Sequence, residues 1–440
     1  MSSIWSDLEF EAKHKVLDGD IKTDVLVIGG GIAGILCAYF LKENGVECML
    51  VEAKKLCSGI TKDTTAKITL QHGLFYDKML RRDGVEKTRL YAKAQLEAIE
   101  RYKMLCKEIP CGYEEKDSYV FSRSDREKIE RETAALEKIG VKAELLERVD
   151  LPISVVGAVR VKNQAQFHPL KFLYGIAENL PVYENTKVVE LRNGVAITNC
   201  GKIFCEKIIV ATHFPFVNMH GFYFLKMYQH RSYVLALENA DAVDGMYVDE
   251  DIKGMSFRMY DGKLLLGGGG HRTGKNGGNW EELRKFANRK YPQAKEITAW
   301  ATQDCITLDG IPYIGKYSSA TPGLYVITGF NKWGMTSAMA GALLLADLVV
   351  GEQNDFTDLF SPSGRLLRPQ FVKNAAEAAL GLIKPTAPRC PHMGCALTYN
   401  KQEHSWDCSC HGSRFSSAGE LIDNPATDDD FSIKEKNKRK

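Results

Sequence analysis

The chain has 440 residues, more than one hydrophobic core usually holds, so we expect two or three domains. Its apolar content of 44%, charged content of 26% and formal net charge of +2 are ordinary for a globular protein and do not indicate nucleic-acid binding. Residues 1–20 lack the pattern of a secretory signal, and the longest apolar stretch, Val25–Leu41, is broken by glycines and shorter than the ~20 residues that span a bilayer. We therefore expect a cytoplasmic protein without a membrane span.

The first predicted elements are a strand, a glycine turn, a helix and a second strand. The apolar run Asp24–Ile28 favours a buried parallel strand, and Gly29–Gly34 follows it with the pattern G-x-G-x-x-G. A helix is predicted over Ile35–Asn44 and a second strand over Val46–Val51. This order is typical of a dinucleotide-binding unit. The alternative is a glycine-rich turn that binds no ligand.

Each glycine of this turn has a physical role in the dinucleotide interpretation. Gly29 allows the tight turn, Gly31 lets the backbone approach the pyrophosphate, and Gly34 lets the helix pack closely on the strand. The N-terminus of the helix offers N–H groups and a positive dipole to the phosphates. Glu52 follows the second strand, where its carboxylate can accept hydrogen bonds from a ribose and would repel the 2′-phosphate of NADP. The motif alone does not distinguish FAD from NAD.

The middle of the chain predicts a second structural region. Its composition favours helices over Val85–Lys107 and Ser124–Lys138 and strands over Ser232–Glu238, Gly254–Tyr260 and Lys263–Gly267. Asp261 and Gly262 lie between the last two strands and predict a hairpin turn.

Four further segments favour FAD. They are the threonine-containing loop Cys57–Thr69, the strand Lys207–His213, the turn Leu308–Gly315, and a strand and glycine turn over Val326–Thr336 that enter a helix predicted over Ser337–Val350. Together with the glycine motif, they resemble the glycine oxidase and D-amino-acid oxidase family of flavoproteins from about Ile21 to Val350. The resemblance implies an α/β fold in which a doubly wound FAD-binding domain is entwined with a mixed-sheet substrate domain.

The resemblance also implies domain boundaries and a cofactor site. The FAD-dependent region would span residues 1–370, with FAD-binding parts at about 20–75, 150–215 and 300–350 and a substrate domain at about 76–149 and 216–299. The residues expected to bind FAD are Gly29, Gly31, Ile32, Ala33, Gly34, Glu52, Ala53, Thr61, Thr64, Thr65, Ala66, Val188, Ala211, Thr212, Gly310, Gly329, Trp333, Gly334, Met335 and Thr336.

A second motif lies near the C-terminus, where four of the 12 cysteines are crowded. Cys390 and His392 form a C-x-H pair, and Cys408 and His411 form a C-x-x-H pair. Two thiolates and two imidazoles are the ligands of a Rieske-type [2Fe–2S] cluster, with two cysteines on one iron and two histidines on the other. A structural zinc site is the alternative, but zinc fingers usually pair like ligands, whereas each loop here offers one of each kind.

This motif resembles Rieske proteins over Arg389–Ala426, and the resemblance implies that Cys395 and Cys410 form a disulfide between the two ligand loops. We expect a small all-β Rieske-type module over 389–440, joined by a linker over 371–388. Only a short stretch, Ala376–Arg389, precedes the first ligand, so the strands that usually support such a cluster are missing.

Two substitutions bear on the reaction. Amine oxidases of the family can carry a lysine that promotes the reaction of flavin with oxygen, and Thr336 stands in its place here. Amino-acid oxidases carry an arginine that binds the substrate carboxylate, and Asp304 stands in its place. An aspartate attracts a cation, so the substrate is expected to be an amine or to lack a carboxylate at that end. A buried acid satisfied by backbone N–H groups is the alternative for Asp304.

No catalytic residue is assigned from the sequence. The candidates are Asp304, Arg258 and His271, and the other residues expected near the flavin are His72, His168, His213, His230, Arg231, Lys332 and Trp333. Arg231 and Arg258 could restore a carboxylate clamp, although structural roles are common for such residues.

The predicted function is that of an FAD-dependent dehydrogenase acting on the C–N bond of a small amine or amino acid. Reduced FAD would pass electrons to the Rieske cluster and then to an external acceptor. The alternatives are an FAD oxidase that produces hydrogen peroxide beside a vestigial cluster module, and a non-catalytic redox sensor or electron-transfer protein.

Overall fold

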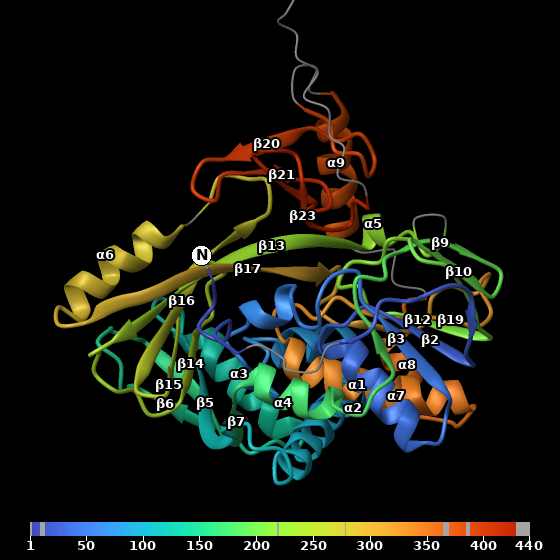
Figure 1. Cartoon of the computed structure of the whole chain (residues 1–440). Helices are drawn as coiled ribbons and strands as arrows, with labels where there is room; N and C mark the ends of the chain where they lie inside the picture. The colour runs from blue at the N-terminus through green and yellow to red at the C-terminus, as the bar shows by residue number, and fades with distance from the viewer. Residues whose placement is uncertain are drawn as a thin grey trace, which may run out of the picture.

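The computed structural model describes residues 2–8, 14–217, 220–277, 279–363, 369–383 and 388–427. It contains a six-stranded sheet, a nine-stranded sheet and two four-stranded sheets. The first two belong to the body of the molecule, and the C-terminal four-stranded sheet lies on the nine-stranded sheet beside β13 and β17 (Figure 1). No helix in the described part of the chain is long and apolar enough to cross a membrane.

The six-stranded sheet is parallel except at one edge, as the first motif predicts. Its order is β18-β19-β12-β2-β3-β8, and only β18 runs antiparallel to its neighbour. The strands are β2 (Val25–Ile28), β3 (Cys48–Val51), β8 (Val182–Tyr183), β12 (Lys207–Val210), β18 (Tyr313–Lys316) and β19 (Leu324–Thr328). In β2, Val25 and Val27 belong to one hydrophobic core, and Leu26 and Ile28 belong to another. Burial on both faces explains why this strand is continuously apolar.

Each face of this sheet is covered by different elements. Helices α1 (Ile32–Glu43) and α7 (Gly334–Val350) share the larger core with one face. On the other side lies a small sheet of order β1-β11-β10-β9, formed by β1 (Ile21–Lys22), β9 (Val188–Arg192), β10 (Val195–Thr198) and β11 (Lys202–Phe204). The arrangement confirms the α/β FAD-binding domain expected from the sequence, with a small sheet in place of helices on one face of the parallel sheet.

The nine-stranded sheet is mixed and forms the second region. Its order is β17-β13-β16-β15-β14-β5-β7-β4, and β6 pairs with β7. The strands are β4 (Lys67–Ile68), β5 (Glu114–Ser122), β6 (Glu144–Leu146), β7 (Gly157–Gln166), β13 (Met227–Glu238), β14 (Met246–Asp249), β15 (Ser256–Tyr260), β16 (Lys263–Arg272) and β17 (Lys295–Thr307). Because β4 and β7 come from outside 76–149 and 216–299, and β17 extends beyond residue 299, the chain crosses between the two regions several times.

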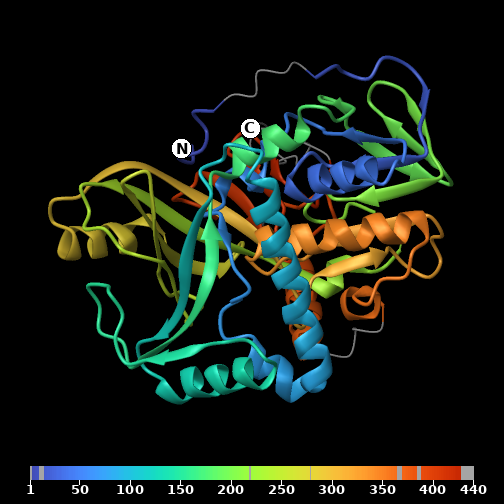
Figure 2. The ribbon, with the colours of Figure 1, turned by 90° about the horizontal axis from the view of Figure 1, so that it is seen from below.

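Helices connect and cover these sheets. The longest, α2 (Tyr76–Leu105), crosses the molecule between the two regions and is kinked at Gly84 (Figure 2). The others are α3 (Arg126–Lys138), α4 (Pro169–Ala177), α5 (Tyr223–Lys226), α6 (Trp280–Lys290), α8 (Thr357–Phe360), α9 (Pro369–Ile383) and the 3₁₀ helix Ile60–Asp63. The two helices and three strands predicted for the middle of the chain are therefore present, and Asp261 and Gly262 form the turn with positive φ angles.

The C-terminal module is a small antiparallel sheet of β20 (Leu397–Asn400), β21 (Ser405–Cys408), β22 (Arg414–Ser416) and β23 (Leu421–Asp423). Its buried core consists of Leu397, Phe415, Ala426 and the cysteines Cys390, Cys395, Cys408 and Cys410. Helix α9 begins before the expected linker, 371–388, and occupies most of it, so this segment is a helix that packs beside the module (Figure 1). So small an apolar core gives the module little stability of its own.

Candidate functional site

One cavity of about 1570 Å³ lies between the two regions, and most residues expected to bind FAD line it. The glycine turn, the threonine loop, the end of β12 and the start of α7 all contribute to its wall. The expected residues that do not line the cavity are Gly34, Ala66, Gly329 and Thr336.

The glycine turn leaves no room for side chains. Gly29 has a φ of 111°, and a Cβ there would lie 2.6 Å from the carbonyl oxygen of Ala211. A Cβ on Gly34 would lie 1.8 Å from the carbonyl oxygen of Gly29, and one on Gly31 would lie 3.0 Å from the Thr61 hydroxyl. The Thr61 hydroxyl in turn accepts a hydrogen bond from the Ile32 N–H at 3.1 Å, so the threonine loop closes against the helix N-terminus. This bare backbone at a helix N-terminus suits a pyrophosphate.

Glu52 is held at the rim of the same cavity. Its two carboxylate oxygens accept hydrogen bonds from the Gly30 N–H at 2.7 Å and the Lys54 N–H at 2.8 Å. Burial raises the pKa of Glu52, and these two N–H donors oppose that rise. The carboxylate is thus oriented beside the glycine turn, where the ribose of a dinucleotide is expected.

Arg258 has a positioning role in place of the substrate role considered for it. Its side chain is fully buried outside the cavity wall and donates hydrogen bonds to the carbonyl oxygens of Thr65 and Ala66, both at 2.7 Å. Both bonds come from Nη1 and fix the threonine loop, whereas Nε and Nη2 have no hydrogen-bond partner among the described residues. Because Arg258 does not line the cavity, it is not placed to clamp a substrate carboxylate there.

Lys67 is a cavity residue that the sequence analysis missed. Its ammonium donates a hydrogen bond to the Thr65 hydroxyl at 3.0 Å, and burial lowers its pKa to about 7. Its place inside the threonine loop was the available signal, because that loop was expected to lie along the flavin.

His72 and Trp333 form one wall of the cavity near the start of α7. Their rings stack at a centroid distance of 5.1 Å. The two ring nitrogens of His72 contact the Tyr91 hydroxyl at 2.7 Å and the Thr336 hydroxyl at 3.1 Å, and burial lowers its pKa to about 3. Thr336 therefore lies behind the wall, and His72 is a neutral structural residue.

Asp304 lies in the cavity wall, on the strand pair β13–β17. It is the register partner of His230, and both residues line the cavity. Burial raises the pKa of Asp304 to about 6, and Lys332 and Arg231 oppose the rise. Neither ring nitrogen of His230 has a hydrogen-bond partner among the described residues, and burial lowers its pKa to about 2.

Lys332 points into the cavity, a direction that the sequence left open. Its φ of 76° lies in the left-handed region, within the turn between β19 and α7. The ammonium donates a hydrogen bond to the Ser232 hydroxyl at 3.2 Å, and burial lowers its pKa. Asp304, His230, Ser232 and Lys332 thus form a polar group on one part of the wall.

The remaining candidate histidines have different positions. His271 stacks on Tyr233 at 5.7 Å outside the cavity wall, which removes it from the reacting part of the site. His168 caps α4 by accepting a hydrogen bond from the Lys171 N–H at 3.3 Å. His213 does line the cavity, and burial lowers its pKa.

The four expected cluster ligands come together on two neighbouring loops. The Nδ1 atoms of His392 and His411 lie 3.3 Å apart, and Cys390 and Cys408 are close enough that each thiol shifts the pKa of the other, upward for Cys390 and downward for Cys408. Like ligands are therefore adjacent in space although each loop carries one of each kind. This arrangement fits a Rieske cluster, in which one iron has two cysteine ligands and the other has two histidine ligands.

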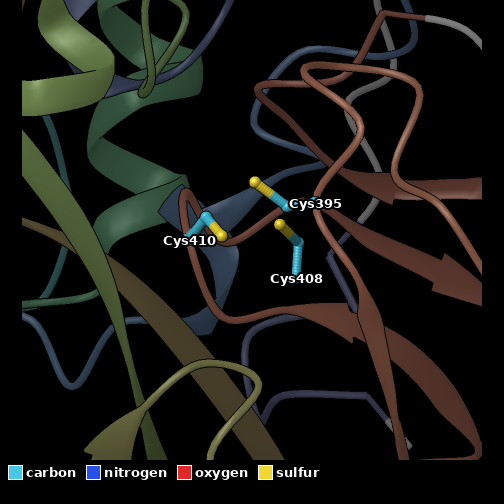
Figure 3. Close-up of side chains that lie close together, drawn as sticks. All are labelled: Cys395, Cys408 and Cys410. Carbon is cyan, nitrogen blue, oxygen red and sulfur yellow. The ribbon is translucent and has the colours of Figure 1, made fainter. Parts of the chain in front are cut away.

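The expected disulfide is not formed in the structure. Cys395 and Cys410 are free cysteines, and their sulfur atoms share a pocket with that of Cys408, all within 4.8 Å of one another (Figure 3). A disulfide requires a sulfur–sulfur distance of about 2.05 Å. The two cysteines therefore lie close together, as the resemblance implies, but they are not bonded to each other.

The C-terminal module forms part of the wall of the FAD cavity. Residues of its loops and of β22 and β23 line the cavity, among them Glu403, His404, Arg414, Asp423 and Asn424. Asn424 donates a hydrogen bond to the carbonyl oxygen of Phe214 at 2.9 Å. The C-terminal module therefore borders the cavity, although the four expected cluster ligands do not line it.

Two family comparisons match complementary parts of the chain. The sequence profile of the FAD dependent oxidoreductase family matches residues 24–348, and that of the Rieske [2Fe-2S] domain matches residues 375–434.

Individual relatives are also similar. YhfW of Bacillus subtilis (strain 168), whose name classes it as a Rieske 2Fe-2S iron-sulfur protein, is 33% identical over 93% of each chain. Gamma-glutamylputrescine oxidoreductase of Escherichia coli (strain K12) is 23% identical, covering 83% of this chain and 94% of the relative. Among solved structures, L-proline dehydrogenase from P. horikoshii has a TM-score of 0.66 at 18% identity, covering 79% of this chain and 98% of that one. Glycine oxidase from Geobacillus kaustophilus has a TM-score of 0.65 at 18% identity, covering 78% and 99%.

Proposed function

The chain belongs to the family of FAD-dependent oxidoreductases and carries a Rieske [2Fe–2S] domain, and we propose that it is a dehydrogenase oxidising a small amine or amino acid. The names of three similar proteins specify gamma-glutamylputrescine, L-proline and glycine, all of which carry an amine nitrogen. These names support a reaction at a C–N bond.

The observation that carries the dehydrogenase proposal is that the Rieske domain forms part of the wall of the FAD cavity. Glu403, Asp423 and Asn424 come from the Rieske domain and line the cavity that holds the FAD-binding glycine turn. FAD supplies two-electron oxidation and the cluster supplies one-electron transfer to an acceptor outside the chain. A Rieske domain in this position would offer electrons a short path from reduced FAD to the external acceptor. An oxidase, which passes its electrons directly to oxygen, would not need such a path.

The chain's own residues suggest how each cofactor is held. For FAD, Gly31 and the N-terminus of α1 would face the pyrophosphate, Glu52 would accept from the ribose, and Thr64 and Thr65 would lie along the ring system. For the cluster, Cys390 and Cys408 would hold one iron and His392 and His411 the other.

The polar group on β13 and β17 suggests how the substrate is held. The carboxylate of Asp304 would bind the substrate ammonium, and it is ionised above a pKa of about 6. Because oxidation of an amine to an imine releases protons, the same carboxylate oxygens can accept one of them. Lys332 would attract any carboxylate that the substrate carries.

A cytoplasmic location agrees with the state of the cysteines, all of which are free in the structure. Free thiols persist in a reducing compartment.

Oxygen reactivity tests the proposal. The reduced flavin of a dehydrogenase should reoxidise slowly in air and rapidly with a one-electron acceptor. Rapid reoxidation in air with stoichiometric hydrogen peroxide would instead assign an oxidase. If no amine or amino acid bleaches the flavin while the cluster cycles reversibly, the chain is a redox sensor.

A further inference from the structure

Side chains of the FAD-dependent region cap the ligand loop that contains Cys408 and His411. Arg272 at the end of β16 donates hydrogen bonds to the carbonyl oxygens of Ser409 at 3.0 Å and Cys410 at 3.1 Å. The next two carbonyl oxygens along the loop are capped by glutamines.

Gln229 on β13 donates to the carbonyl oxygen of His411 at 3.1 Å, and Gln303 on β17 donates to that of Gly412 at 2.9 Å. Four successive carbonyl groups of the loop are therefore fixed from outside the Rieske domain. The two glutamines are buried and also bond to each other, at 2.6 Å between Gln303 Nε2 and Gln229 Oε1.

The loop also packs closely against the same region. A Cβ on Gly412 would lie 2.5 Å from the Cβ of Gln229, and a Cβ on Gly274 would lie 2.5 Å from the Ser409 nitrogen. Helix α9 closes the other side, where a Cβ on Gly381 would lie 2.5 Å from the sulfur of Cys410. Glycine at each of these positions allows a contact that any side chain would obstruct.

We propose that side chains of the FAD-dependent region form the outer shell of the cluster, the groups around its ligands that the shortened Rieske domain does not supply. Within this outer shell, Arg272 both positions the ligand loop and raises the reduction potential of the cluster. Groups around a metal site orient its ligands and tune its potential. A guanidinium beside the ligand loop stabilises the added electron of the reduced cluster, so it shifts the potential upward.

Arg272 also contacts the wall of the FAD cavity. Its guanidinium lies over the ring of Tyr228, 4.7 Å from the centroid, and Tyr228 lines the cavity. One side chain thus touches the cluster loop and the wall facing the flavin. A third bond, to the Asn374 amide oxygen of α9 at 3.1 Å, holds the guanidinium in this position.

This inference rests on the proposed cluster ligands and is independent of the substrate proposed above. Iron and acid-labile sulfide in the wild-type protein test whether the cluster exists. The Arg272 variants then test the outer shell alone. The proposal that a cluster is present and the proposal that Arg272 tunes it can therefore fail separately.

The experiment compares the intact chain with Arg272→Gln and Arg272→Lys, purified without air. In Arg272→Gln the midpoint potential, measured by redox titration with EPR detection, should fall enough to disfavour reduction of the cluster about tenfold, which is about 59 mV for one electron. Arg272→Lys keeps the charge but loses the paired hydrogen bonds to the Ser409 and Cys410 carbonyl oxygens. Its midpoint potential should lie between those of the wild type and Arg272→Gln. Arg284→Gln removes an arginine of α6 that pairs with Glu296 at 2.7 Å, and it should change neither iron content nor potential.

Loss of iron from Arg272→Gln with FAD retained would also support the proposal, because the outer shell would then be needed to keep the cluster. If that variant does not fold, Arg272→Lys and Gln303→Met decide the matter through the same two measurements. Wild-type iron content together with a wild-type potential in the folded variants would overturn it.

Discussion

The guanidinium of Arg231 on β13 and the carboxylate of Glu403 in the Rieske domain form an ion pair with only 3% and 7% of their side chains exposed. Glu403 also accepts hydrogen bonds from Arg414 at 2.7 Å and from the Tyr233 hydroxyl at 3.1 Å. Arg414 in turn pairs with Asp407 and Asp423. A buried network therefore joins the Rieske domain to the substrate sheet and fixes the position of one on the other.

Glu403→Gln should loosen this junction. Removing the charge leaves Arg231 and Arg414 buried with less compensation, and breaking a buried pair in this way costs about 3–5 kcal/mol. Urea unfolding followed by circular dichroism should show the loss. Glu190→Gln, which alters an exposed pair with Arg192, should change the unfolding free energy by less than about 1 kcal/mol. Equal stability of the two variants would contradict a role for the network in docking.

Asp304→Asn should weaken the binding of a cationic amine. Losing a charge-assisted bond costs about 1.5–3 kcal/mol, which raises KM roughly 10- to 100-fold. In the wild type, KM should rise as the pH falls through about 6, because Asp304 becomes protonated there and loses its charge. In the variant this pH dependence should disappear. A KM profile that keeps the same inflection in Asp304→Asn would show that another group causes it.

Gly34→Ala should lose FAD. The added methyl group would lie 1.8 Å from the carbonyl oxygen of Gly29, so the helix must move away from the glycine turn. FAD content after purification, measured by absorbance, should fall sharply. Gly157→Ala is the matched control, since its methyl group would meet Ile129 at an ordinary 3.6 Å. Full FAD occupancy in Gly34→Ala would contradict the assignment of the turn.

Cys390→Ser should lose iron while keeping FAD. The Cys390 thiol lies close to that of Cys408, which raises its pKa, and it would be one of the two cysteine ligands of one iron. Iron and labile sulfide should both fall, and the flavin spectrum should persist because the FAD-binding turn lies in another domain. Cys200→Ser, at a half-buried thiol on the small sheet side, should keep its iron. Retention of the cluster by Cys390→Ser would remove this residue from the ligand set.

The sequence predicted the parts of the fold that local patterns determine. The apolar strand Val25–Ile28, the glycine turn and the C-x-H and C-x-x-H pairs each carry their physical reason in adjacent residues. What it missed depends on distant contacts. The docking of the Rieske domain requires Arg231 to meet Glu403, and no local pattern couples positions so far apart along the chain.

In the candidate site, too, local patterns could be predicted from the sequence and distant contacts could not. The FAD-binding turns were found because glycines and threonines mark them, whereas Arg258 was considered as a substrate residue and proves to hold the threonine loop. Arg272, Gln229 and Gln303 carry no recognisable motif, and only the fold of β13, β16 and β17 brings them to the cluster loop.

The most direct test of the account is an anaerobic titration of the purified chain with an amine or amino-acid substrate, followed by absorption and EPR together. The account predicts that flavin bleaching is accompanied by the EPR signal of a reduced histidine-ligated [2Fe–2S] cluster in the same molecules. Flavin bands alone, with zinc or no metal bound to the protein, would contradict it.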